Sequence, residues 1–139
     1  VFDLRVYMDE FSLSSSSRSQ VIDVTSQVEH IVRKSGVKDG LCLIHSLHTT
    51  TAIVLNEHES GLMSDILAKI SRDFPRGAGW MHDRVDDNAD SHLASIFLGQ
   101  SILLPVRGGM LLRGTWQSIL FVELDGPRGR RIIVEVLGE

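Results

Sequence analysis

The final third of the chain constrains the fold most, because it contains almost nothing but strand-like segments. Residues 102–106, 110–124 and 131–137 are rich in β-branched and other apolar residues. Gly108-Gly109 and Asp125-Gly126-Pro127 provide the turns between them. A chain that places its helices early and ends in consecutive strands is typical of α+β packing rather than of a doubly wound parallel sheet.

Helices are predicted at three places by apolar residues that recur at helical spacing. Thr25 is a candidate cap for the first helix, and Gly36 stands where a left-handed residue would end it. Asn56 and Glu59 have the spacing of a capping box before the second helix, and Asp90 or Ser91 is a candidate cap for the third. The apolar stripe of the second helix comprises Leu62, Met63, Ile66, Leu67, Ile70 and Phe74.

Strands are also expected near the N-terminus and between the first two helices. Residues 41–55 carry apolar side chains on both alternating faces, which predicts one or two central strands that are covered on both sides. In total we expect six to eight strands and about three helices. With 139 residues and no internal boundary, residues 1–139 are expected to form a single domain.

Composition excludes several classes of protein. The formal net charge of −4 disfavours general binding to nucleic acid. No apolar run approaches the roughly 20 residues that cross a bilayer, so we expect no membrane association. Cys42 is the single cysteine, which excludes an internal disulfide and a cysteine-built zinc site. It fits a reducing compartment, and we expect a cytoplasmic protein.

Three of the six histidines lie in segments that could meet in the fold. His48 is within a predicted buried strand, His82 is in an aspartate-rich loop, and His92 begins the third helix. Three converging imidazoles can hold a transition metal and leave one coordination position open. The alternative is that His48 is a hydrogen-bonded core residue and the other two are surface residues.

Carboxylates and arginines suggest further candidates. Glu57 begins a helix, where it serves either as a general base or as a favourable charge. Asp83 could orient a ligating histidine. Glu123 falls among apolar residues of a strand and needs a partner, which Arg130 or Arg131 would supply. Arg128 is in a turn that could hold a phosphate.

An ordered set of short motifs resembles the YjbQ-like family, often named secondary thiamine-phosphate synthases. The resemblance covers about residues 21–139, and each motif is weak alone. The motifs are His48-Thr49-Thr50-Thr51-Ala52, Asn56-Glu57, Trp80-Met81-His82-Asp83, Asn88-Ala89-Asp90-Ser91-His92, Leu98-Gly99-Gln100-Ser101, Gly114-Thr115-Trp116-Gln117, Glu123, Asp125-Gly126-Pro127-Arg128 and Arg131. Arg113 departs from the family, whose members often have an apolar residue there.

The resemblance implies a small α+β domain with a β-sandwich, assembled as a homotrimer. It implies that His48, His82 and His92 hold a divalent metal ion. Glu57, Asp83, Gln117 and Glu123 then become catalytic candidates, with Asp90 nearby, and Trp116, Arg128 and Arg131 become candidates for binding substrate. The implied activity is a weak thiamine-phosphate synthase reaction, which joins a pyrimidine pyrophosphate to a thiazole phosphate.

Two hypotheses follow for the function. The first is a metal-dependent enzyme acting on a phosphorylated small molecule, in which Glu57 or Asp83 moves protons and Arg128 or Arg131 binds the anion. Three imidazoles favour zinc over magnesium, and zinc makes hydrolysis as natural as transfer. The second is a non-catalytic homotrimer that binds a metal or a metabolite.

Overall fold

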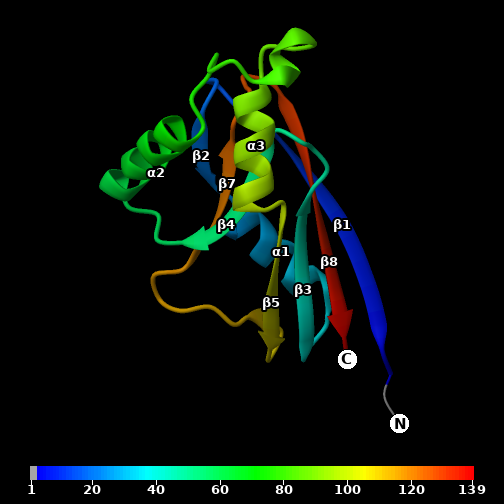
Figure 1. Ribbon diagram of the computed structural model, residues 1–139. Coiled ribbons are helices and arrows are strands. Elements are labelled where there is room, and N and C mark those ends of the chain that lie inside the picture. The colour runs from blue at the N-terminus through cyan, green and yellow to red at the C-terminus, as the bar shows by residue number, and fades with distance from the viewer. Residues whose placement is uncertain (1–2) are drawn as a thin grey trace.

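The computed structural model describes residues 3–139, which form eight strands, three α-helices and one short 3-10 helix (Figure 1). All strand pairs are antiparallel and belong to two sheets. The predicted α+β class and the numbers of strands and helices are confirmed.

The larger sheet has five strands and the smaller sheet has three. In the larger sheet the order is β1 (Arg5–Ser14), β8 (Gly129–Gly138), β3 (Gly40–Ser46), β5 (Ser101–Arg107) and β6 (Met110–Leu111). In the smaller sheet the order is β2 (Gln20–Asp23), β7 (Ser118–Glu123) and β4 (Thr51–Asn56). The helices are α1 (Thr25–Ser35), α2 (Ser60–Asp73) and α3 (Ala89–Leu98), and the 3-10 helix is η1 (Met81–Arg84).

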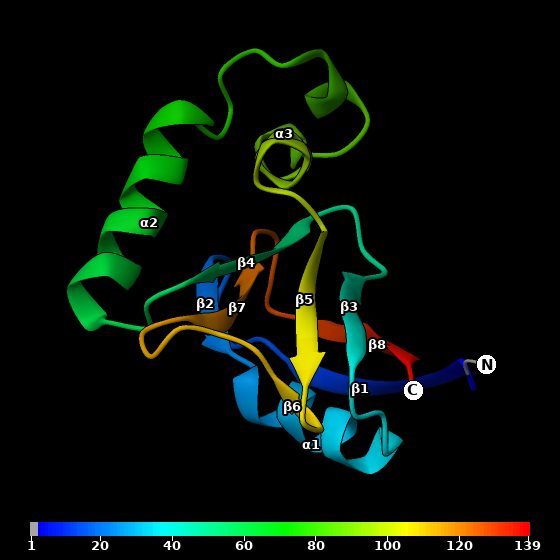
Figure 2. The same cartoon turned by 90° about the horizontal axis from the view of Figure 1, so that it is seen from below.

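The main core lies between the two sheets and α1. Val28, Ile31 and Val32 form the buried face of α1, as their spacing predicts. Phe121 of β7 is among the largest fully buried side chains in this core. Cys42 of β3 is buried there too, and this burial raises the pKa of its thiol to about 12. Figure 2 shows α1 on one side of the strands and α3 on the other.

A smaller core joins α2 and α3 to the outer face of the smaller sheet. Ala94 of α3 packs against Ala52 of β4 and Val122 of β7. Two buried serines fix α3 to this sheet: Ser91 Oγ donates to the carbonyl of Leu124 at 2.5 Å, and Ser95 Oγ donates to that of Thr51 at 2.6 Å. By contrast, α2 has no fully buried residue. None of the helices in the described part of the chain is long and apolar enough to cross a membrane.

The helix ends differ in part from the sequence prediction. Gly36 ends α1 with a φ of 72°, as expected. Thr25 is the first residue of α1 rather than its cap, and Asp23 accepts its N–H at 2.9 Å. Glu59, not Asn56, caps α2 by accepting the N–H of Leu62 at 2.9 Å. Short side-chain acceptors are common near all these ends, so spacing alone did not identify the one with the right geometry.

The beginning of α3 also differs from the prediction, because neither Asp90 nor Ser91 is its cap. Asn88 is the N-cap position, and Asp83 of η1 accepts the N–H of Ala89 at 3.0 Å. A residue six positions upstream supplies this acceptor, which is beyond the reach of a local capping rule.

Two strand predictions were wrong in their extent. Residues 110–124 are not one strand, because residues 112–117 form an exposed connection between β6 and β7. The segment 41–55 was expected to be covered on both sides, but Leu41 of β3 is exposed. The outer face of the larger sheet is uncovered in the single chain and carries mostly apolar side chains, with Glu135 between Met8 and Leu43. Its apolar residues are Val6, Met8, Leu41, Leu43, Leu103, Ile133 and Leu137.

Candidate functional site

A polar groove lies where β3 finishes and β8 begins, close to the start of α3. The link between β3 and β4, residues 47–50, forms one wall. The turn before β8 and the start of α3 form the others. The groove encloses about 360 Å³ and is lined by Leu47, His48, Thr49, Thr50, Asp86, Asn88, His92, Arg128 and Arg130.

His48 is held in one tautomer by the backbone. Its Nε2 accepts the N–H of Arg131 at 2.8 Å, so in the neutral ring the proton is on Nδ1. Partial burial, followed by the charge of nearby Arg130, lowers the pKa of His48 below its ordinary value. The imidazole is therefore neutral at neutral pH.

His82 and His92 lie against each other. Their ring centroids are 4.7 Å apart, and the rings meet edge to face at 76°. Together they border a second hollow, whose other lining residues are Trp80, Met81, Ala89 and Leu93. His92 lines both this apolar hollow and the polar groove, so the two are neighbours.

The side chains do not form the predicted three-histidine metal centre in this arrangement. Among residues 3–139, no three His, Cys, Asp or Glu side chains are grouped so that they could hold a metal ion. One nitrogen of His48 is already engaged by Arg131. Asp83, expected to orient a ligating histidine, instead uses Oδ1 as an acceptor at the start of α3. The structure thus pairs His82 with His92 and places His48 on the wall of the groove that His92 also lines.

Glu123 and Arg130 form a buried ion pair beneath the groove. The side chain of Glu123 is 0% exposed and that of Arg130 is 3% exposed. Glu123 accepts five hydrogen bonds: two from Arg130 and one each from Ser15 Oγ and the N–H groups of Leu124 and Asp125. Burial alone would raise the pKa of Glu123, but the bonds from Arg130 and Ser15 outweigh it and hold the pKa below its ordinary value.

This environment bears on two expectations for Glu123. The predicted need for a partner is confirmed, and the partner is Arg130. A carboxylate that is buried and surrounded by donors holds its proton weakly, and the contacts of Glu123 suit it to position Arg130; its catalytic role stays a prediction. Arg130 in turn donates to Thr50 Oγ1 at 2.9 Å, which ties the pair to the wall of the groove.

The two candidate anion-binding arginines are placed differently. Arg128 is half-exposed in the groove and its Nη2 is 3.2 Å from Asp125 Oδ2. The same oxygen of Asp125 accepts from Asn88 Nδ2 at 2.8 Å. The side chain of Arg131 instead lies on the outer face of the larger sheet and pairs with Glu10 at 2.8 Å. Only the backbone of Arg131 reaches the site, so its predicted contact with substrate is not available in the single chain.

Glu57, Trp116 and Gln117 lie at the far end of the smaller sheet. Asn56 pairs with Ser118 at that end, whereas Thr51 pairs with Glu123 at the end beside the groove. Trp116 is 72% exposed, and Gln117 accepts the N–H of Gly114 at 2.8 Å. One chain therefore does not bring these three candidates together with the histidines.

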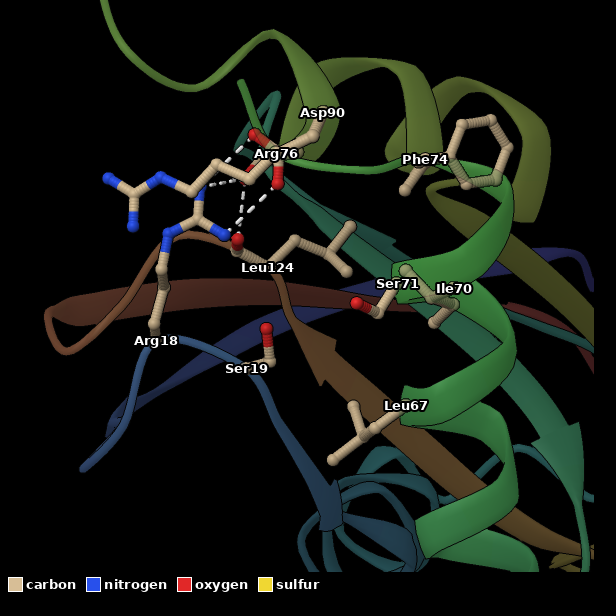
Figure 3. A pocket seen from close by; sticks show the side chains of 11 residues that line it. Arg18, Ser19, Leu67, Ile70, Ser71, Phe74, Arg76, Asp90 and Leu124 are labelled. Atoms are coloured by element: carbon tan, nitrogen blue, oxygen red, sulfur yellow. Dashed lines mark hydrogen bonds and ion pairs between the residues drawn. The ribbon is translucent and has the colours of Figure 1, made fainter. Parts of the chain in front are cut away.

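Asp90, in the first turn of α3, belongs to a separate polar cluster with Arg18 (Figure 3). It forms two hydrogen bonds with Arg18, at 3.0 and 3.1 Å, and this ion pair lines a pocket with Ile70 of α2 and Phe74, which directly follows α2. The cluster fixes the start of α3 to the segment before β2. Sequence reasoning missed Arg18 and Ser15 and named Asn88 only as part of a motif, because each acts on a residue that is distant in sequence.

The two sheets and α1 define a small α+β domain. The polar groove and the adjacent apolar hollow at one end of it form the candidate ligand site. The family described as UPF0047 protein YjbQ-like matches residues 9–139. The chain therefore belongs to the YjbQ-like UPF0047 family, as its motifs predict.

Relatives and solved structures agree with this assignment. A UPF0047 protein of Archaeoglobus fulgidus is 50% identical over 128 residues, which cover 92% of this chain and 99% of the relative. A YbjQ-like protein of unknown function from Sulfolobus solfataricus has a TM-score of 0.96 at 52% identity, covering 98% of this chain and 99% of that one. An uncharacterised family protein of Clostridium acetobutylicum has a TM-score of 0.88 at 36% identity, covering 92% and 98%.

Proposed function

We propose that this protein is an enzyme that acts on a phosphorylated small molecule bound in the groove. The observation that carries the proposal is the groove itself, where half-exposed Arg128 faces solvent beside the neutral imidazole of His48. An arginine fork offers a phosphate two parallel hydrogen bonds. The Nδ1–H of His48 and the hydroxyls of Thr49 and Thr50 add neutral donors.

The apolar hollow beside the groove suggests the other half of the ligand. Trp80, Met81 and Leu93 offer a surface for a flat or apolar organic group. A heterocycle that carries a phosphate or pyrophosphate would span the two hollows across His92. Pyrimidine pyrophosphate and thiazole phosphate, the substrates that the family resemblance implies, belong to this class.

His92 is our candidate for proton transfer, because it lies between the two hollows. In hydrolysis the attacking water must give up a proton. In transfer the thiazole nitrogen forms the new C–N bond and the C–O bond to pyrophosphate breaks, so a proton donor helps the departing pyrophosphate to leave. An imidazole can serve in either way. Asp83, which faces the start of α3, and Glu57, which lies at the far end of the smaller sheet, are less suitably placed.

A divalent metal, with zinc favoured over magnesium, remains our expectation from the family resemblance. The present arrangement of His48, His82 and His92 does not fit a three-ligand centre, so no step of the proposed reaction is assigned to a metal. Elemental analysis of untagged protein, and of His48→Ala, His82→Ala and His92→Ala, tests whether these side chains rearrange around an ion. About one metal per chain, lost in all three folded variants, would establish the centre. If no metal is bound after reconstitution, the proposed metal centre is ruled out.

The enzyme proposal is tested with binding and turnover in the same variants. We expect wild-type protein to bind inorganic pyrophosphate and to join a pyrimidine pyrophosphate to a thiazole phosphate or to hydrolyse one of them. Arg128→Gln should weaken pyrophosphate binding about tenfold, and His92→Gln should lower turnover about 100-fold or more.

The matched control is Arg107→Gln, because this exposed arginine lies at the end of β5, away from the groove. It should leave binding and turnover unchanged. Wild-type protein that neither binds pyrophosphate nor turns over any of these phosphates would overturn the proposal. Binding without turnover would favour the non-catalytic alternative.

We also propose that the protein is a homotrimer assembled through the outer face of the larger sheet. Val6, Met8 and Leu103 on this face are 64%, 61% and 59% exposed in the single chain. Strand register places Val6, Leu137 and Leu41 side by side across three strands, while the next row across the same strands contains Glu135 between Met8 and Leu43. Contiguous apolar surface of this kind marks an interaction site.

Sedimentation equilibrium tests the assembly directly. We expect three times the chain mass of 15.4 kDa for wild-type protein and one chain mass for Leu103→Lys, which places a charge in the face. Lys38→Ala, which removes an exposed side chain from the loop before β3, is the control and should leave the trimer intact. A monomeric wild-type protein would contradict the proposal.

A further inference from the structure

The serine-rich segment between β1 and β2 lies against the turn that carries Arg128. Ser15 is 6% exposed, and its N–H donates to the carbonyl of Arg128 at 3.1 Å. Gly126 of the turn donates its N–H to the carbonyl of Arg18 at 2.9 Å. Two backbone hydrogen bonds therefore join segments that are more than 100 residues apart.

The hydroxyl of Ser15 makes three further contacts with the same part of the chain. Its Oγ donates to Glu123 Oε1 at 2.6 Å, accepts the N–H of Arg128 at 3.0 Å and lies 3.2 Å from the carbonyl oxygen of Arg128. A single buried hydroxyl thus connects the buried ion pair beneath the groove to the backbone of the exposed arginine in the groove.

The turn fits closely against this segment. A Cβ atom added at Gly126 would meet the carbonyl oxygen of Ser17 and would lie 2.6 Å from Ser15 Oγ. The turn consequently has no room to settle closer to Ser15, and it cannot carry a side chain at position 126 without moving away.

We propose that Ser15 is a positioning residue that holds the backbone of Arg128 and so orients its guanidinium toward an anionic ligand. The proposal rests on the proposed function, since it concerns the anion that Arg128 would bind. Without Oγ, the N–H of Arg128 loses its acceptor and Glu123 loses a donor. The turn then populates other conformations, and the apparent affinity falls with the fraction that is competent to bind.

The test compares Ser15→Ala with Ser14→Ala, which alters an exposed neighbouring serine at the end of β1. The probe is inorganic pyrophosphate, measured by titration calorimetry well below the unfolding temperature of each protein. We expect binding about 3- to 10-fold weaker in Ser15→Ala and unchanged in Ser14→Ala. Ser15→Thr keeps an Oγ and should restore most of the affinity.

The amide resonance of Arg128 separates a positioning role from a general loss of stability. It should shift in Ser15→Ala and return toward its wild-type position in Ser15→Thr. If Ser15→Ala does not fold, Gly126→Ala tests the same contact by pushing the turn away, and it should weaken binding too.

The outcomes distinguish this proposal from the one on which it rests. Wild-type protein that fails to bind pyrophosphate would overturn the function proposed for the groove. Wild-type binding that is unchanged in folded Ser15→Ala would overturn the role of Ser15 and leave that function standing. If Ser15→Ala binds pyrophosphate weakly but the Arg128 amide resonance does not shift, the positioning role of Ser15 is likewise overturned and the proposed function stands.

Discussion

Glu123 and Arg130 show how one buried pair organises the candidate site. The pair is enclosed between the sheets, and its hydrogen bonds reach Ser15, Thr50 and the backbone before the turn. Removing one member would leave the other charge buried without a partner. We therefore expect Glu123→Gln to lower the free energy of unfolding at pH 7 by about 3–5 kcal/mol, measured by urea denaturation.

Asp73→Asn is the control for this change, because it removes the exposed partner of Lys69 on α2 and should alter stability little. Since the folded-state pKa of Glu123 is lowered, its contribution is present above the unfolded-state pKa of about 4.3 and is lost as pH falls through the folded-state value. The difference between wild type and Glu123→Gln should narrow in acid. Equal losses of unfolding free energy in Glu123→Gln and in the control variant would contradict the role of burial.

His48 should titrate below the ordinary histidine pKa of about 6.5, because burial and Arg130 disfavour its charged form. The unfolded chain binds this proton first, so the contribution of His48 to stability is full above pH 6.5 and declines as pH falls. NMR of the ring nitrogens should show the Nδ1–H form at neutral pH. A midpoint above 6.5 would contradict the effect of burial and Arg130, and an Nε2–H ring would rule out the hydrogen bond from Arg131.

Among the elements, α2 and α3 differ in how they are attached. Two buried serine hydroxyls fix α3 to the smaller sheet, whereas α2 rests on it through half-buried side chains only. We expect the amides of α2 to exchange with solvent by local opening, well before those of α3 and β7. Hydrogen exchange followed by NMR checks this order, and equal protection in all three elements would contradict it.

Periodicity predicted the elements better than it predicted their surroundings. The buried face of α1 and its end at Gly36 follow from local rules and are confirmed. Which acceptor caps α3 depends on Asp83 folding back from η1, and which face of β3 is covered depends on what packs against it. Local spacing in the sequence predicts neither the acceptor at the start of α3 nor the covered face of β3.

The same limit applies to the candidate site, where the sequence indicated a need for a partner but not which residue meets it. Sequence correctly indicated that Glu123 needs a cation, but it could not choose between Arg130 and Arg131. Alternation along β8 settles the choice, because Arg130 faces the interior while Arg131 faces Glu10 on the outer face. Likewise, Glu57 and Trp116 follow the motif order of the histidines, yet β4 and β7 carry them to the opposite end of the smaller sheet.

For the whole molecule, the apolar outer face of the larger sheet links stability to concentration. If copies associate through this face, folding and association are coupled, and the unfolding temperature rises with protein concentration. Calorimetry over a hundredfold range should show this rise in wild type. It should be absent in Leu103→Lys, and a wild-type temperature independent of concentration would contradict association.

The reaction rate of the single cysteine, which lies in the core, reports how often the folded protein opens. Cys42 has a buried thiol whose raised pKa keeps it protonated, so a thiol-reactive dye can modify it only in molecules that have opened the space between the sheets. The modification rate of wild-type protein should therefore follow global opening and should increase in Glu123→Gln in step with the lost stability. A rate that stays fast and equal in both proteins would mean that solvent reaches the core without unfolding.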